Sequence, residues 1–247
     1  MRSSFLTAFF CMLCVLAAFT SCDKNSDASY ANPRYATIGL LETDSENRFC
    51  IVSDKGNKFH VLNTQDLLDN EFTEGDRVYA EMLGETNLEE PFDGDISVIY
   101  ASKVLTKDIV ALTDENSAEI GDDPIDIYAL WNSGKYLNLQ FFLLTNGARP
   151  HYINLVTVDE PKKQENGYVY LELRHNGNGN TLVNSYTGYA SFDISKYLDD
   201  TTVKGFIIRD KTFRNGEVFL KYDLEREGVN PQTVRTPQQE ENNVVTR

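Results

Sequence analysis

Cysteine, histidine and tryptophan are scarce in this sequence, which limits the chemistry that the chain can support. Four cysteines, three histidines and one tryptophan occur among 247 residues. Cys11, Cys14 and Cys22 belong to the N-terminal segment, so Cys50 is the single thiol of the part that looks foldable. This count excludes an intrachain disulfide and a metal site built from several cysteines. Cys50 lies in an apolar run, which predicts a buried strand cysteine.

Sequence motifs for catalysis are missing as well. The histidines, His60, His151 and His175, show no pair at the spacing of metal ligands. Neither a Gly-x-Ser-x-Gly nucleophile turn nor a phosphate-binding loop is present. The sequence therefore predicts a non-catalytic protein with no metal and no cofactor.

Basic residues are fewer than acidic ones. The chain has 23 basic and 38 acidic residues and a formal net charge of −15. Such a chain is a poor electrostatic match for nucleic acid, so no nucleic-acid partner is expected. Carboxylate pairs occur at Asp93-Gly94-Asp95 and at Asp122-Asp123, and the first has the oxygen ligands that calcium prefers. Because no EF-hand pattern accompanies them, solvated acidic turns are the favoured interpretation.

The longest apolar run lies at the N-terminus. It extends from Phe5 to Phe19 behind a short start that carries Arg2. A bilayer span needs about 20 apolar residues, so this run has the length of a signal-peptide core instead. The following Thr20-Ser21-Cys22 resembles the lipobox of bacterial lipoprotein precursors, although Phe19 stands where leucine is commonest.

The lipobox resemblance implies that the chain is cut before Cys22, whose thiol then carries diacylglycerol beside a fatty acyl chain such as palmitate. Residues 1–21 are accordingly predicted to be a signal peptide and residues 22–34 a polar tether. Two or more acyl chains anchor a protein stably on a membrane. The expected location is the cell envelope, at the outer membrane of a Gram-negative bacterium. An ordinary secretory signal cleaved nearby is the alternative.

Long amphipathic helical stretches do not stand out, whereas aromatic residues are plentiful, with 14 Phe and 13 Tyr. Strands favour aromatic residues, so an all-β fold is predicted. Residues 35–112 are expected to form a small OB-like barrel, in which Thr64–Asn70 makes a short helical turn capped by Thr64 or Asp66. An immunoglobulin-like sandwich is the main alternative there. The predicted barrel strands are 35–41, 49–52, 59–62, 77–82 and 96–104.

A second domain is predicted over residues 125–224, behind a polar, acidic linker at 113–124. Asn-Gly pairs punctuate this domain and favour hairpins, so an antiparallel β-sandwich is expected. The linker should be the first internal site of proteolysis. Residues 225–247 are polar and are predicted to be a disordered tail. The predicted sandwich strands are 125–131, 136–144, 152–158, 168–175, 188–192, 203–208 and 218–222.

This arrangement resembles the NigD-like lipoproteins of Bacteroides-type bacteria, an OB-like domain followed by a β-sandwich. In the first domain the resemblance rests on Asp54-Lys55-Gly56 and on Glu74-Gly75-Asp76-Arg77-Val78. In the second it rests on residues 131–139, on Leu171-Glu172-Leu173-Arg174-His175-Asn176 and on Ser191-Phe192-Asp193. The resemblance implies an envelope lipoprotein. The family name comes from a proposed bacteriocin-immunity role, and the family supplies no catalytic residues.

The segment from Leu171 to Asn180 is the most distinctive in the chain. Strand alternation predicts Leu171 and Leu173 in the core, with Glu172 and Arg174 on the opposite face and His175 at the start of a glycine-rich loop. Replacing Arg174 should cost more stability than replacing His175. The candidate binding residues are Glu172, Arg174, His175, Asn176 and Trp131.

Two functions compete from the sequence, and an unrecognised hydrolase is a third alternative behind both. One is a non-catalytic envelope lipoprotein that binds a protein or peptide partner, with bacteriocin immunity or envelope protection as its purpose. The other is a glycan-binding accessory lipoprotein, in which Trp131 and tyrosines form a stacking surface. An exposed apolar patch would favour a protein partner, and clustered exposed aromatics would favour glycans.

Overall fold

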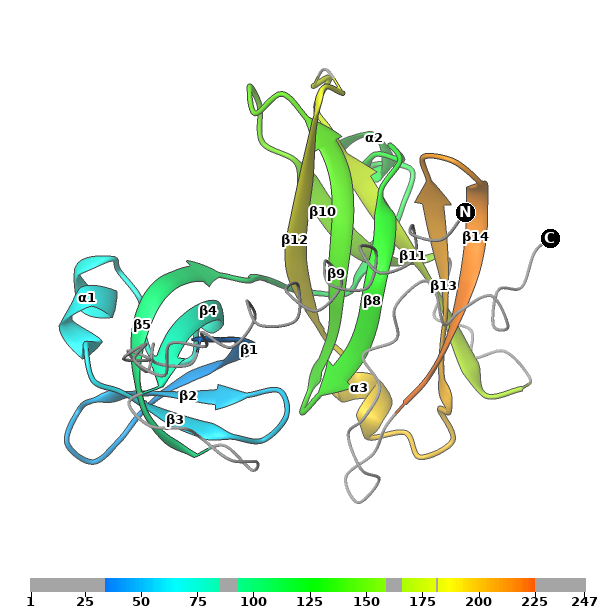
Figure 1. The fold of residues 1–247 in the computed structure, drawn as a ribbon. Coiled ribbons are helices and arrows are strands. Elements are labelled where there is room, and N and C mark those ends of the chain that lie inside the picture. The colour runs from blue at the N-terminus through cyan, green and yellow to red at the C-terminus, as the bar shows by residue number, and fades with distance from the viewer. Residues whose placement is uncertain (1–33, 85–92, 159–165, 181, 225–247) are drawn as a thin grey trace, which may run out of the picture. The chain divides into compact units, whose positions relative to one another are not determined.

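The computed structural model of the chain describes residues 34–84, 93–158, 166–180 and 182–224, and these residues form two β structures (Figure 1). The predicted signal peptide, Cys22, the tether before Arg34 and the C-terminal tail lie outside the described residues. Within the described part of the chain, no helix is long and apolar enough to cross a membrane.

The first structure is a closed five-stranded barrel with the strand order β1-β2-β3-β5-β4. Its strands pair antiparallel except β3 and β5, which run parallel. The short helix α1 separates β3 from β4, as the OB-like prediction requires. Its N-cap position is Asn63, not Thr64 or Asp66, and the Thr64 hydroxyl instead donates to the Val61 carbonyl. The elements are β1 (Arg34–Thr43), β2 (Phe49–Ser53), β3 (Lys58–Val61), α1 (Thr64–Asp69), β4 (Arg77–Gly84) and β5 (Gly94–Lys103).

The second structure is a sandwich of two sheets, so the predicted all-β fold class is confirmed. One sheet has the order β14-β13-β11-β10-β7, and the other has the order β6-β12-β9-β8. All seven predicted sandwich strands are present, and the glycines of their Asn-Gly turns adopt positive φ. The strands are β6 (Leu105–Asp108), β7 (Val110–Leu112), β8 (Asp126–Ser133), β9 (Tyr136–Thr145), β10 (Tyr152–Val158), β11 (Tyr168–Asn176), β12 (Asn184–Asp193), β13 (Gly205–Thr212) and β14 (Gly216–Asp223).

The sandwich begins earlier than the sequence predicted, because β6 and β7 belong to it. β6 pairs parallel with β12 in one sheet, and β7 pairs parallel with β10 in the other. Ile109, between them, is buried in the sandwich core. The predicted linker at 113–124 is therefore part of the sandwich, where it carries the short helix α2 (Ser117–Ile120) with Ile120 buried. β11 and β13 also pair parallel, so the sandwich is mixed and not wholly antiparallel.

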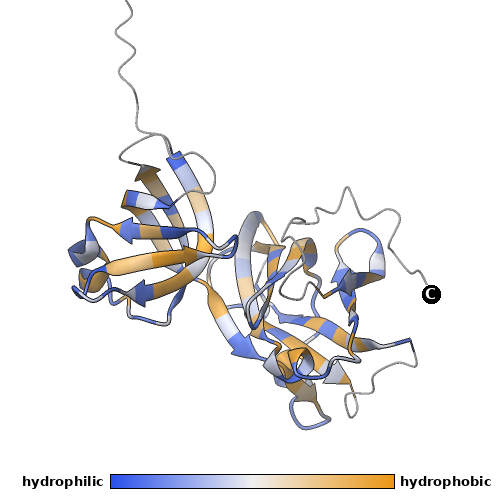
Figure 2. Cartoon of the chain, turned by 90° about the horizontal axis from the view of Figure 1, so that it is seen from below, coloured by the Kyte–Doolittle hydropathy of each residue, from blue (hydrophilic) through white to orange (hydrophobic). Residues whose placement is uncertain are grey.

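Alternation along the strands builds the sandwich core. Hydrophobic and hydrophilic residues alternate in many of the strands (Figure 2), as expected when one face of a sheet is buried. The two sheets contribute fully buried side chains to one cluster, among them Leu139 and Phe192 from one sheet and Leu155, Leu171 and Phe206 from the other. A further short helix, α3 (Ser195–Leu198), adds Tyr197 to this core.

Candidate functional site

Strand β11 divides the predicted site residues between its two faces. Leu171 and Leu173 lie in the core and are almost fully buried, as the alternation predicted. Glu172 and Arg174 lie on the opposite face, where Arg174 Nε donates to Glu172 Oε2 at 2.7 Å. His175 shares the inner face with the two leucines. The structure therefore separates His175 from Glu172 and Arg174, which the sequence had grouped with it.

The outer-face charges form a network centred on Asp122. Arg174 and Arg209 reach Asp122 Oδ1 at 3.0 and 2.8 Å, and Lys211 Nζ reaches Oδ2 at 3.1 Å. Arg209 also contacts Glu217 at 2.6 Å. Burial works to raise the pKa of Asp122, but hydrogen bonds from Arg209 and Lys211 outweigh it and lower the pKa.

Positive and negative groups in the Asp122 network match in number. Arg174, Arg209 and Lys211 face Asp122, Glu172 and Glu217, and Tyr170 donates a further hydrogen bond to Glu172. Because each charged group in the network is paired with one of opposite sign, little net charge is left to attract a charged ligand. It fastens the segment before β8 to the sheet, so Glu172 and Arg174 are structural partners in this geometry.

His175 is paired with His151, a residue that the sequence had not singled out. His175 is 2% exposed, and its ring stacks on that of His151 with centroids 5.0 Å apart and planes inclined by 8°. His151 Nδ1 and His175 Nε2 lie 2.7 Å apart. His151 comes from the β9–β10 connection, so only the folded sandwich brings the two imidazoles together.

The hydrogen bonds of the pair define its protonation. His175 Nδ1 lies 2.9 Å from the Pro124 carbonyl, which can only accept, so Nδ1 carries the proton and Nε2 accepts from His151 Nδ1. His151 Nε2 then accepts from Thr145 Oγ1 at 2.8 Å, and Asn180 Nδ2 lies 2.9 Å from the same nitrogen. Both rings are neutral, and all four nitrogens are occupied.

Burial is also the main cause that lowers the pKa of each ring in this pair. The contacts of the two rings connect the Pro124 segment, the β9–β10 connection and the end of β11.

A small cavity of about 160 Å³ opens beside His175 at the end of the sandwich. Small-molecule pockets usually measure about 300–1,000 Å³, whereas a cavity of about 150 Å³ takes up a benzene-sized group. The chain continues from the cavity wall into three exposed apolar residues, Leu182, Val183 and Tyr186, which are 55%, 62% and 53% exposed. The cavity is lined by Asp123, Pro124, His175, Gly177, Gly179, Asn180, Leu182 and Phe213.

Asn176 holds the loop that forms one wall of this cavity. Its Nδ2 donates to the Glu119 carbonyl, and its Oδ1 accepts from the backbone N–H of Asn178. Gly177 donates its N–H to Asp123 Oδ2 at 2.8 Å. A Cβ at Gly177 would lie 3.3 Å from that oxygen and in ordinary van der Waals contact with both imidazoles, so a larger residue there would need the Asp123 carboxylate to shift slightly.

Trp131 does not join the other predicted site residues. Its Nε1 donates to Asp54 Oδ2 at 2.8 Å, which links β8 of the sandwich to the β2–β3 turn of the barrel. Arg77 of β4 is buried there and donates to Asp54 at 2.6 and 2.9 Å. The same guanidinium donates to Asn138 at 2.7 Å and lies over the Tyr136 ring. Trp131 is thus a junction residue, and a sugar-stacking role does not fit its placement.

An OB-type barrel followed by a two-sheet sandwich defines an all-β protein. Residues 108–224 match the model of the NigD-like C-terminal beta sandwich domain. The sandwich is therefore similar to the NigD-like C-terminal domain, and the predicted family resemblance is confirmed. A search of curated proteins found no match.

Solved structures from Bacteroides are similar in fold over most of the chain. A protein of unknown function from Bacteroides vulgatus is 22% identical, with a TM-score of 0.66 over 84% of this chain and 98% of its own. A NigD-like immunity protein from Bacteroides caccae is 18% identical, with a TM-score of 0.57 over 84% and 98%. A putative lipoprotein from Bacteroides fragilis is 12% identical, with a TM-score of 0.59 over 78% and 98%. At these identities the likeness is one of fold.

Proposed function

We propose that the protein is a non-catalytic, lipid-anchored envelope protein that binds a peptide segment of a protein partner at the open end of its sandwich. The observation that carries the proposal is the cavity at His175, which Leu182 lines, together with the exposed apolar residues Val183 and Tyr186 that follow Leu182 along the chain. Exposed apolar side chains that gather beside a cavity are typical of a protein-binding surface. One apolar side chain of the partner would fill the cavity.

A glycan partner is supported less well. The exposed tyrosines Tyr100, Tyr128, Tyr152 and Tyr186 come from the barrel and from both sheets of the sandwich, so they do not share one sheet. A sugar-stacking surface needs aromatic faces that lie together. The cavity is also smaller than a sugar-sized ligand pocket.

The envelope location rests on the N-terminal sequence. The apolar run, the small residues before Cys22 and the polar residues after it support a lipidated N-terminus. One structural neighbour is named a putative lipoprotein and another a NigD-like immunity protein, which agrees with an envelope protein of protective function. The identity of the partner is left to experiment.

The test uses Leu182→Asp with a matched control. Leu62, on the barrel, is 53% exposed, nearly as much as Leu182, so Leu62→Asp adds the same charge at a similar exposure. Envelope extracts would be passed over immobilised wild-type and variant proteins, and the affinity of each captured partner would then be measured with purified components. We expect Leu182→Asp to weaken binding by at least about tenfold, as loss of a central anchor does.

Equal binding by wild type and Leu182→Asp would place the interface elsewhere and contradict the proposal. Binding that Leu62→Asp also loses would point to a general charge effect. If glycans screened in parallel bind with the same dependence on Leu182, the glycan function replaces the peptide function.

A further inference from the structure

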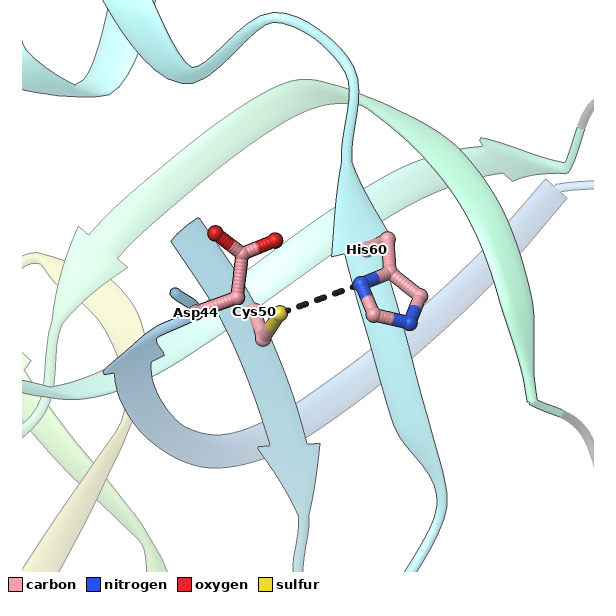
Figure 3. A group of neighbouring side chains, drawn as sticks. All are labelled: Asp44, Cys50 and His60. Atoms are coloured by element: carbon pink, nitrogen blue, oxygen red, sulfur yellow. Dashed lines mark hydrogen bonds between the residues drawn. The ribbon is translucent and has the colours of Figure 1, made fainter. Parts of the chain in front are cut away.

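Three possible metal ligands meet on the outer side of the barrel. Cys50 Sγ lies 3.2 Å from His60 Nδ1. One ligand atom each from Asp44, Cys50 and His60 lie within 4.8 Å of one another. Figure 3 shows Cys50 and His60 on neighbouring strands with their reactive atoms facing, and the Asp44 carboxylate beside the sulfur.

Strand register explains why these side chains meet. Cys50 of β2 is directly opposite His60 of β3. Their neighbours Ile51 and Phe59 belong to the barrel core, so alternation directs Cys50 and His60 to the outer face. Cys50 is nevertheless fully buried. Cys50 is thus the buried strand cysteine that the sequence predicted, and its thiol lies against an imidazole and a carboxylate outside the apolar cluster of the barrel.

The Asp44 carboxylate is already oriented by its own turn. Its Oδ1 accepts backbone N–H groups of Glu46 and Arg48 at 2.8 and 3.0 Å. Its Oδ2 binds the Arg48 guanidinium at 2.9 Å. The Arg48 side chain is 53% exposed, so it can move into solvent and give its place to a metal cation. The backbone hydrogen bonds would remain as the outer support that ligating carboxylates usually have.

We propose that Asp44, Cys50 and His60 form a zinc site on the outer face of the barrel, with the fourth position open to water. A sulfur, a nitrogen and a carboxylate oxygen form a donor set that Zn²⁺ accepts, whereas Ca²⁺ and Mg²⁺ take oxygen ligands. On binding, the Cys50 thiol releases its proton to solvent, and His60 coordinates through Nδ1 while Nε2 keeps its proton. The ion would join the β1–β2 turn to β2 and β3.

The experiment is a Zn²⁺ titration of the chelator-treated full chain by calorimetry, with Co²⁺ as a spectroscopic probe. We expect a tight site at one ion per chain and a thiolate-to-cobalt charge-transfer band in the near ultraviolet. Cys50→Ser should abolish the band, and the difference from wild type separates Cys50 from the N-terminal cysteines. His60→Gln and Asp44→Asn should each weaken Zn²⁺ binding by at least about tenfold, since loss of an outer-shell partner alone costs that much.

Two variants act as controls. Glu46 is in the same turn as Asp44 but outside the cluster, so Glu46→Gln should keep wild-type affinity. Arg48→Ala removes the competing guanidinium and should preserve or raise the affinity. The site is refuted if wild type shows no Cys50-dependent cobalt band, or if Glu46→Gln weakens zinc binding as much as Asp44→Asn. Circular dichroism of each variant confirms that it is folded.

Discussion

Arg209 is the residue on which the Asp122 network most depends. It is 6% exposed and contacts both Asp122 and Glu217. Burial works to lower its pKa, but hydrogen bonds to these carboxylates outweigh it and raise the pKa, so the guanidinium stays charged. Removing one partner from a buried charge cluster leaves the others uncompensated, which is more costly than losing a surface pair.

We therefore expect Arg209→Ala to destabilise the protein by about 3 kcal/mol. Arg174→Ala should cost about 1 kcal/mol, roughly 2–4 °C in Tm for a protein of this size. Arg214→Ala, at an exposed turn position, is the control and should leave Tm unchanged. Thermal unfolding followed by circular dichroism provides the measurement. Equal Tm values for all three variants would show that the network contributes nothing to stability.

The His151–His175 pair should make stability depend on pH. Both rings have a folded-state pKa below the ordinary value near 6.5, because burial disfavours the charged ring. Above about pH 7 the rings are neutral in both states, and the pair adds no pH dependence. As pH falls below about 6.5, the unfolded chain binds protons that the folded chain refuses, so stability decreases until the folded-state pKa values are reached.

Thermal unfolding between pH 7.5 and 5 would test this. In the double variant His151→Gln/His175→Gln, stability should fall less steeply as the pH falls. His60→Gln, measured with a chelator present because His60 belongs to the proposed zinc site, is the control, since His60 lies outside the pair. An unchanged dependence of stability on pH in the double variant would contradict the neutral pair.

Because His175 is buried, His175→Ala should cost about 2 kcal/mol of stability, at least as much as Arg174→Ala. This reverses the order expected from the sequence.

At the scale of elements, the segment at 113–123 should resist proteolysis. The sequence predicted a cleavable linker, but Ile120 is buried, Asp122 is held by three cations and Asp123 donates its N–H to the His175 carbonyl. Cleavage requires the backbone to open locally. Limited proteolysis with mass spectrometry should find no early cut there in wild type, and Asp122→Ala should make the segment sensitive. Early cleavage in wild type would restore the linker interpretation.

Strands with strong local signals were predictable, and those without were not. The hairpin at Ser53–Asn57 and the Asn-Gly turns mark their strands by turn chemistry alone. β6, with the sequence Leu105-Thr106-Lys107-Asp108, is short and polar, and it is a strand because β12, far along the chain, pairs with it. Likewise, no spacing rule relates His151 to His175 or Asp44 to Cys50, because strand register in the folded protein creates these pairs.

At the scale of the whole molecule, Trp131 provides a natural probe of the barrel–sandwich junction. It is the single tryptophan and donates to Asp54, which also binds the buried Arg77. Its fluorescence should therefore change in the same transition as the far-ultraviolet circular dichroism, as one cooperative unit requires. Asp54→Asn should separate the two transitions or lower both. Non-coincident transitions in wild type would mean that the junction opens before the domains unfold.

Membrane attachment of the whole protein is tested at Cys22. Cys22→Ser removes the thiol that lipidation needs, so the variant should remain unprocessed or leave the membrane fraction. The wild type should stay membrane-bound and accumulate as a precursor under globomycin. Cys50→Ser is the matched control, since it removes a different cysteine. Membrane retention of Cys22→Ser at the wild-type level would contradict the lipid anchor.

The sheet pairing of β6 and β7 has a consequence for the order in which the protein acquires its structure. Chains emerge from synthesis N-terminus first, so every barrel strand is available before the sandwich begins. β7 must wait for β10, and β6 must wait for β12, which ends only at Asp193. Until β10 and β12 have been made, β7 and β6 have no partner strand, and the apolar faces of the two sheets stay uncovered. The barrel can thus complete itself early, while the sandwich closes only after most of the chain has appeared.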